Sequence, residues 1–109
     1  MVEKFRPASV PPPGGPYSAG VRSGNPLFLA APGPFDAQGV RLGEDFAGQV
    51  RAVFDSLERV ASEAGTSRKN ATRMDAHPST PNYFDEFNAV MAEYVSEPRP
   101  ARTSIPAAD

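Results

Sequence analysis

The sequence predicts an α+β fold in two layers, with a mixed β-sheet that carries two helices packed on one face. Thirteen prolines are present, eight of them within the first 34 residues, which excludes helices there and favours short strands joined by stiff loops. Two later segments repeat apolar residues at three- and four-residue steps, as amphipathic helices do. One short segment separates these helices and another follows them, so the predicted order is β-β-β-α-β-α-β.

Three strands are predicted before the first helix. Residues 2–6 alternate apolar and polar side chains, and residues 17–22 would place Tyr17, Ala19 and Val21 on one face. Residues 27–31 are continuously apolar, which is typical of a strand covered on both faces. The turn residues 23–25 between these last two segments indicate a hairpin.

The first helix is predicted from Phe46 to Ala64. Glu44 and Asp45 are expected in its first turn, where negative charge suits the helix dipole, and Gly65 is expected to end it. The predicted apolar stripe consists of Phe46, Val50, Val53, Phe54, Leu57, Val60, Ala61 and Ala64.

The second helix is predicted over residues 82–96, with Thr80 as N-cap, Pro81 at the first helical position and Pro98 closing it. Residues 70–76 have a low β-strand propensity. A strand is nevertheless predicted there, because two helices on one face of a sheet need a strand between them to bring the chain back. Residues 103–107 are the predicted final strand. The expected apolar stripe of this helix is Tyr83, Phe87, Val90, Met91 and Tyr94.

The predicted sheet has a face that no helix covers, and that face would carry Tyr17 and residues 27–29. An uncovered apolar face in a small domain usually becomes a subunit interface. We therefore expect a single domain over residues 1–109 that assembles with copies of itself.

Composition narrows the functional classes. Eleven Lys and Arg against 13 Asp and Glu give a formal charge of −2, which argues against nucleic-acid binding. The absence of cysteine excludes a thiolate zinc site or a cysteine nucleophile, and Asp75 with His77 does not make a metal site. With no signal peptide and no membrane-spanning apolar run, no membrane association is expected and the cytoplasm is the expected location.

Arg102 is the strongest candidate for a functional residue. Pro98 and Pro100 stiffen the approach to it, and its planar guanidinium matches a two-oxygen anion such as a carboxylate. An ordinary surface or interface ion pair is the alternative, and on these residues alone it is favoured. Asn88 neighbours the apolar stripe of the second helix, and it is either a core-edge polar group or a hydrogen-bond donor in a pocket.

Several motifs together resemble the RidA/YjgF family of small enamine/imine deaminases. They extend from about Val2 to Ile105, and the more specific ones are the run from Phe87 to Tyr94 and the Pro-Ala-Arg-Thr sequence. The matching segments are Gly15-Pro16-Tyr17-Ser18, Gly24-Asn25-x-Leu27-Phe28-Leu29, Pro34-Phe35-Asp36-x-x-Gly39, the first helix ending at Ala64-Gly65, Phe87-Asn88-x-Val90-Met91-Ala92-Glu93-Tyr94 and Pro100-Ala101-Arg102-Thr103.

The resemblance implies a RidA-like (chorismate-mutase-like) fold, a homotrimer with ligand clefts between subunits, and hydrolysis of imines and enamines such as 2-aminoacrylate without a cofactor. Matched position by position, Arg102 would bind the substrate carboxylate and act as the catalytic residue. Four further positions would bind substrate: Tyr17, Ala31, Asn88 and Ser104.

The chain departs from the family pattern in three places. Ala30-Ala31-Pro32 replaces the usual Ser-Gly-Gln, the strand before the second helix is unusually polar, and the family's C-terminal strand with its glutamate is expected to be missing after Asp109. These departures keep two alternatives open: a non-catalytic protein that binds small carboxylates as a sensor or interaction partner, and a specialised biosynthetic enzyme on the same fold.

Overall fold

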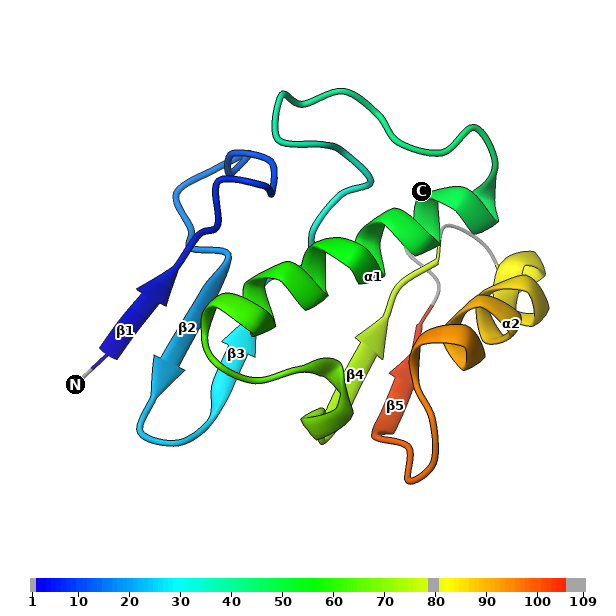
Figure 1. Cartoon of the computed structure of the whole chain (residues 1–109). Helices are drawn as coiled ribbons and strands as arrows, with labels where there is room; N and C mark the ends of the chain where they lie inside the picture. Colours follow the sequence, from blue (N-terminus) through cyan, green and yellow to red (C-terminus); the bar gives the residue numbers. More distant parts are fainter. Residues whose placement is uncertain (1, 79–80, 106–109) are drawn as a thin grey trace. The chain divides into compact units, whose positions relative to one another are not determined.

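The computed structural model describes residues 2–78 and 81–105, which divide into two compact units. We call residues up to Ser67 the N-terminal unit and residues from Arg68 the C-terminal unit. The order of elements confirms the predicted α+β class and the sequence β-β-β-α-β-α-β, with two short 3₁₀ turns added (Figure 1).

The N-terminal unit contains an antiparallel sheet of β1 (Val2–Phe5), β2 (Gly20–Ser23) and β3 (Leu27–Leu29), in that order. Glycine at position 20 allows close packing with α1 (Phe46–Glu63), because a Cβ there would lie 2.7 Å from Val60 Cγ1. Arg22, on the same face of β2, donates a hydrogen bond to the Ala64 carbonyl at the end of α1. One face of this sheet therefore lies against α1.

The opposite face of this sheet is open, in agreement with the predicted uncovered face. Phe28 is paired with Val21 and is 63% exposed. The prediction was wrong in detail: Leu29 lies on the α1 side, 3.2 Å from the position of a Gly20 Cβ, and the exposed Phe28 excludes cover on both faces. The pleat explains this, since neighbouring residues of a strand point to opposite faces.

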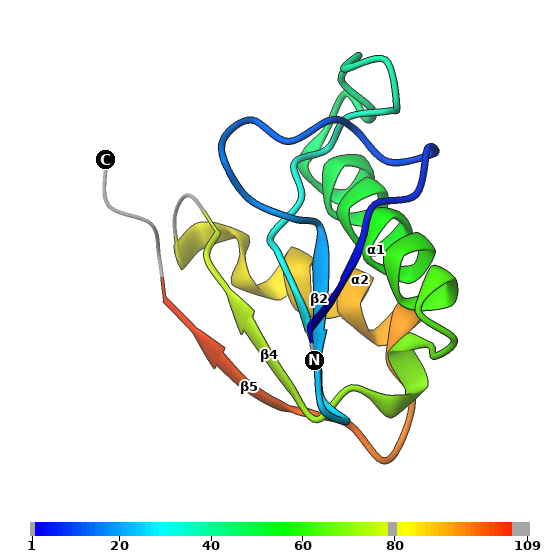
Figure 2. The same cartoon turned by 90° about the vertical axis from the view of Figure 1, so that its left-hand side faces the viewer.

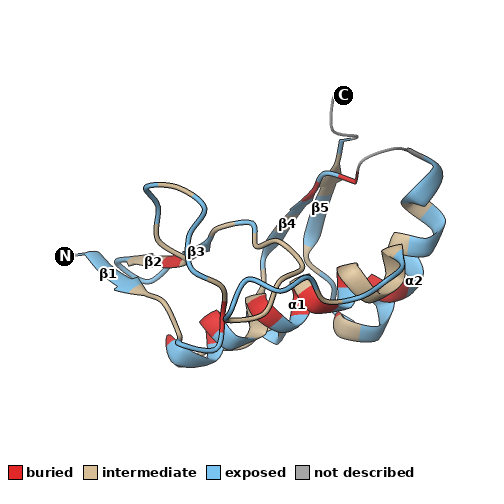
Figure 3. Cartoon of the chain, turned by 90° about the horizontal axis from the view of Figure 1, so that it is seen from above, coloured by how far each residue is buried: buried red, intermediate tan, exposed pale blue. Residues whose placement is uncertain are grey.

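Helix α1 begins and ends where the sequence indicated. Asp45 is its N-cap, with its carboxylate accepting a hydrogen bond from the Gly48 amide at 2.8 Å. The expectation that Glu44 and Asp45 lie in the first turn was wrong, because both precede Phe46. Gly65 follows the helix with φ +84°, the left-handed conformation that terminates many helices. Buried positions recur along α1 in Figure 3 and include Ala52 and Ser56, which the predicted stripe lacked. Three predicted stripe residues, Phe46, Val53 and Leu57, are only half-buried.

The C-terminal unit pairs β4 (Arg73–Ala76) and β5 (Ala101–Ser104) in parallel, with Arg102 opposite Met74. The strands lie side by side in Figure 2, and α2 (Phe84–Tyr94) forms the connection that a parallel pair requires. Val90 and Met91 of α2 are buried.

Several predicted boundaries shift in the structure. The strand predicted over 17–22 begins at Gly20, because the Tyr17 amide is engaged in a turn with the Gly15 carbonyl. The strand predicted over 70–76 is shortened by the 3₁₀ turn Arg68–Asn70, and the second helix is reduced to Phe84–Tyr94 behind the turn Pro81–Tyr83. The final strand begins two residues earlier than predicted. It also ends earlier than predicted, at Ser104, so Ile105 lies outside it. Thr80 as N-cap and the predicted strand residues 106 and 107 lie outside the described residues.

Candidate functional site

The guanidinium of Arg102 is held by α2. One of its terminal nitrogens donates to Asn88 Oδ1 at 2.6 Å and lies 3.4 Å from Met91 Sδ. Its central carbon lies 5.6 Å from the centre of the Phe87 ring, within the range of a cation–π contact. Met91 lies three residues after Asn88 and four residues after Phe87, so it is a neighbour of each of them on the surface of α2. A strand and a helix together therefore fix the direction of this cation.

The contacts of Arg102 leave much of its binding capacity available. A guanidinium has five N–H donors, and the hydrogen bonds described for Arg102 come from one nitrogen and reach an amide oxygen and a thioether sulfur. The residue is exposed, and no ion pair described for the chain involves it. The alternative interpretation of Arg102 as half of a surface ion pair is therefore not supported among the described residues.

Ser104 follows Arg102 by two residues along β5, so both side chains point to the same face of the strand. The Ser104 hydroxyl is buried and has no hydrogen-bond partner among the described residues. Three predicted site residues, Arg102, Asn88 and Ser104, thus come together in the C-terminal unit.

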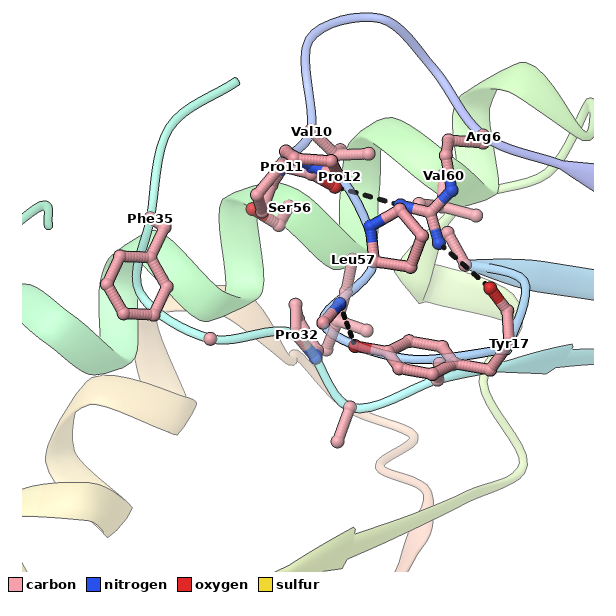
Figure 4. A pocket seen from close by; sticks show the side chains of 16 residues that line it. Arg6, Val10, Pro11, Pro12, Tyr17, Pro32, Phe35, Ser56, Leu57 and Val60 are labelled. Atoms are coloured by element: carbon pink, nitrogen blue, oxygen red, sulfur yellow. Dashed lines mark hydrogen bonds between the residues drawn. The ribbon is translucent and has the colours of Figure 1, made fainter. Parts of the chain in front are cut away.

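Tyr17 and Ala31, the other two predicted residues, line a pocket of about 210 Å³ within the N-terminal unit (Figure 4). Tyr17 is 51% exposed, and its phenolic oxygen accepts a hydrogen bond from the Gly14 amide at 3.3 Å. Arg6 lies in the same pocket and donates to the carbonyls of Pro11 at 2.8 Å and Tyr17 at 3.4 Å. The binding roles of Tyr17 and Ala31 stay predictions.

Sequence reasoning missed three contributors to these sites. Phe87 and Met91 were assigned to the core stripe, although the helical spacing of Met91 from Phe87 and Asn88 could have indicated that it neighbours both. Arg6 was treated as the end of a strand, and no local pattern marks it as a pocket residue.

Residues 2–78 and 81–105 show neither a metal-binding cluster nor a membrane-spanning helix. No group of three or more His, Cys, Asp or Glu side chains there is arranged to hold a metal ion. No helix in that part of the chain is long and apolar enough to cross a membrane.

Comparison with known proteins decides the family. A family model described as Endoribonuclease L-PSP, the model for RidA/YjgF proteins, matches residues 8–109. The chain belongs to the RidA/YjgF family. This membership confirms the resemblance drawn from the sequence motifs.

Individual relatives agree with this assignment. A RutC family protein of Pyrococcus horikoshii is 32% identical over 106 residues, covering 96% of this chain and 84% of the relative. The 3-aminoacrylate deaminase RutC of Acinetobacter baylyi is 33% identical over 105 residues, covering 94% of this chain and 82% of the relative.

A solved structure confirms the predicted RidA-like fold. The crystal structure of RidA from the Antarctic bacterium Psychrobacter sp. PAMC 21119 matches with a TM-score of 0.91 at 26% identity, covering 96% of this chain and 85% of that one. The family thus includes deaminases by name, and its fold is the fold of this chain.

Proposed function

We propose that this chain is a cytoplasmic enamine/imine deaminase that hydrolyses 2-aminoacrylate-type intermediates to 2-keto acids and ammonia. The observation that carries the proposal is the exposed Arg102 guanidinium, which is positioned by Asn88, Met91 and Phe87 and has donors left for a ligand. Such a group can bind a carboxylate with two parallel hydrogen bonds. The naming of a family relative as a 3-aminoacrylate deaminase supports the reaction class.

The reaction depends more on positioning the substrate than on a strongly acidic or basic side chain. Protonation of the terminal carbon of 2-aminoacrylate, with loss of a proton from its nitrogen, gives the imine, whose C=N carbon is already electrophilic. Water adds its oxygen to that carbon while the nitrogen takes a proton. The C–N bond then breaks, the hydroxyl proton passes to the leaving nitrogen, and ammonia and the keto acid are released. Arg102 would anchor the carboxylate and withdraw electron density from the reacting carbon throughout.

We further infer that the chain works as a homotrimer, using the open face of the N-terminal sheet as its interface. Val2 and Phe28 are 54% and 63% exposed there, and Val21 is paired with Phe28. Apolar side chains on an open sheet face are best covered by another copy of the chain. In sedimentation velocity, Phe28→Asp should shift the protein from trimer to monomer, whereas the loop variant Val40→Asp should not. A wild-type monomer would refute the trimer.

The deaminase is tested by enamine decay. A pyridoxal-phosphate dehydratase acting on serine supplies 2-aminoacrylate, and its decay is followed with wild-type protein, Arg102→Ala and the control Arg73→Ala. Arg73 is also exposed and lies on the neighbouring strand, where it pairs with Asp75 at 3.2 Å. We expect acceleration by wild type and Arg73→Ala, and a loss of roughly a hundredfold in Arg102→Ala. No acceleration by folded wild-type protein would refute the deaminase.

A second function is favoured by one observation. The groups in contact with Arg102 are an amide, a thioether and a phenyl ring, none of which exchanges a proton near neutral pH. A protein that binds small carboxylates without converting them would need nothing more. Isothermal titration with pyruvate separates the two functions: Arg102-dependent binding without enamine decay would support the binding protein. A specialised biosynthetic enzyme would show neither activity on these compounds.

A further inference from the structure

Two of the three methionines of the chain lie beside Arg102, one on a strand and one on a helix. Met74 is the residue of β4 directly opposite Arg102 in the parallel pair, so the two side chains point to the same face of the sheet. Met91 reaches the same arginine from α2, with its sulfur 3.4 Å from the Nη1 nitrogen. The proposed carboxylate-binding group is therefore bordered by two oxidisable side chains.

The sulfur of Met91 helps to set the direction of the guanidinium. The same nitrogen, Nη1, donates to Asn88 Oδ1 at 2.6 Å and to Met91 Sδ at 3.4 Å. A thioether sulfur is a weak acceptor, and it fills the space beside this nitrogen without binding it strongly. The position of this edge of the guanidinium therefore depends on the size and polarity of the atom that Met91 presents.

Mild oxidation changes both properties of that atom. With hydrogen peroxide, an S–O bond forms as the O–O bond breaks. The sulfur is thereby oxidised to a sulfoxide, and the peroxide is reduced to water, which carries away both peroxide hydrogens. The flexible apolar side chain becomes polar, and sulfoxide reductases reverse the change.

Met91 is buried without being sealed from solvent. It is 8% exposed, and the guanidinium that contacts its sulfur belongs to an exposed side chain. Exposed side chains change rotamer within nanoseconds, so a molecule as small as peroxide can reach the sulfur when Arg102 rotates away. Met74 is half-buried on the neighbouring strand, and no hydrogen bond is described between it and the guanidinium. It is therefore a matched methionine for comparison.

The oxygen of a Met91 sulfoxide has one favourable direction. Away from Arg102 it would enter the buried side of α2, where an unpaired polar atom is costly. Toward Arg102 it can accept the N–H of Nη1. The 3.4 Å between sulfur and Nη1 is too short to hold an oxygen that stays about 2.7 Å from the nitrogen, so the guanidinium has to move.

We propose that Met91 is an oxidation site that controls Arg102: its sulfoxide displaces the guanidinium and weakens carboxylate binding, and reduction restores it. The consequence for binding rests on the proposed function, because it takes Arg102 as the group that binds the carboxylate. The displacement itself rests only on the contact between Met91 and Arg102.

The test compares the protein before and after treatment with hydrogen peroxide, with the oxidised methionines identified by peptide mass spectrometry. Arg102 is followed through its Nε–H resonance in NMR, which reports on the guanidinium whether or not a carboxylate binds. Isothermal titration with pyruvate measures affinity on the same samples. In wild type we expect the Arg102 resonance to shift as Met91 oxidises, and the Kd for pyruvate to rise at least about tenfold, as a misplaced binding group predicts.

Met91→Leu and Met74→Leu are the matched variants, because leucine keeps a similar apolar volume and has no sulfur to oxidise. Each is compared with its own untreated form. Peroxide should leave the resonance and the Kd unchanged in Met91→Leu, and should change both in Met74→Leu as in wild type. Sulfoxide reductases for both epimers should restore the oxidised wild type.

The inference is overturned if Met91 stays unoxidised while Met74 reacts, if its sulfoxide leaves the Arg102 resonance in place, or if Met91→Leu is as sensitive as wild type. Loss of the helical circular dichroism signal on oxidation would assign the effect to unfolding and would also overturn it. A resonance that shifts in a protein that neither binds pyruvate nor accelerates enamine decay would refute the proposed function and leave the displacement of Arg102 standing.

Discussion

The two units use an arginine in contrasting ways. In the N-terminal unit, Arg6 is half-buried and ties together two points of one loop through backbone carbonyls. In the C-terminal unit, Arg102 is exposed and is oriented by one side-chain amide, that of Asn88. The same chemical group therefore braces a loop in one unit and is presented to solvent in the other.

The difference shows that residue type alone does not assign a role. What separates the two is the nature and number of the hydrogen-bond acceptors. Carbonyls of a folded loop hold Arg6 as part of the structure, whereas an amide on a helix aims Arg102 without neutralising it. Four experiments with substitutions can break or sharpen this comparison.

The largest effect is expected from truncating a core side chain of the N-terminal unit. Phe54 is 5% exposed on α1, so Phe54→Ala should lower the free energy of unfolding by about 3–5 kcal/mol, through lost burial and an unfilled cavity. Urea denaturation followed by circular dichroism measures this. The control Val40→Ala, at a residue 60% exposed, should change it by less than about 0.5 kcal/mol. Equal effects would show that the core face of α1 is wrongly assigned.

The two arginines should differ in stability. Arg6→Ala should cost roughly 1–2 kcal/mol, because two backbone carbonyls lose a charged donor. Arg102→Ala should leave the free energy of unfolding and the Tm nearly unchanged while carboxylate binding is lost. The same urea titrations distinguish a structural role, expected for Arg6, from a carboxylate-binding role, expected for Arg102. If Arg102→Ala is the more destabilising variant, or dissociates the assembly, the clamp assignment fails.

The amide that aims Arg102 can be tested next. Asn88→Ala should raise the KM for 2-aminoacrylate about tenfold, since the guanidinium loses its 2.6 Å acceptor and its fixed direction. Asn88→Asp should also impair carboxylate binding, because a negative charge at that position would occupy the guanidinium itself. Steady-state kinetics on both variants, with exposed Asn82→Ala as control, measures the effect. Unchanged kinetics in Asn88→Asp would exclude a guiding role for this residue.

The smallest expected effect concerns the start of α1. Asp45→Ala should cost about 1 kcal/mol, because the Gly48 amide loses its capping carboxylate. Its neighbour Glu44 is the matched control, and Glu44→Ala should change the free energy of unfolding by only a few tenths of a kcal/mol. Thermal denaturation of the two variants gives the comparison. A larger loss in Glu44→Ala would contradict the assigned cap.

The sequence by itself determined the class of fold and the positions of the long elements. Prolines in the first 34 residues excluded helices there, and the apolar spacing with Gly65 located α1 from Phe46 onward. It also identified Arg102, because the Pro-Ala-Arg-Thr motif resembled a known family. These signals are local, and backbone restrictions and helical periodicity can be recognised within one segment.

The tertiary structure alone decided which side chains meet. The bond from Arg102 to Asn88 spans 14 residues and depends on where β5 starts, which the sequence placed two residues too late. Only the fold shows that Arg6 reaches Tyr17 and that the polar Ser56 is buried in an otherwise apolar wall. Such contacts depend on strand register and on how a helix packs against its sheet. The sequence of a single segment specifies neither of these.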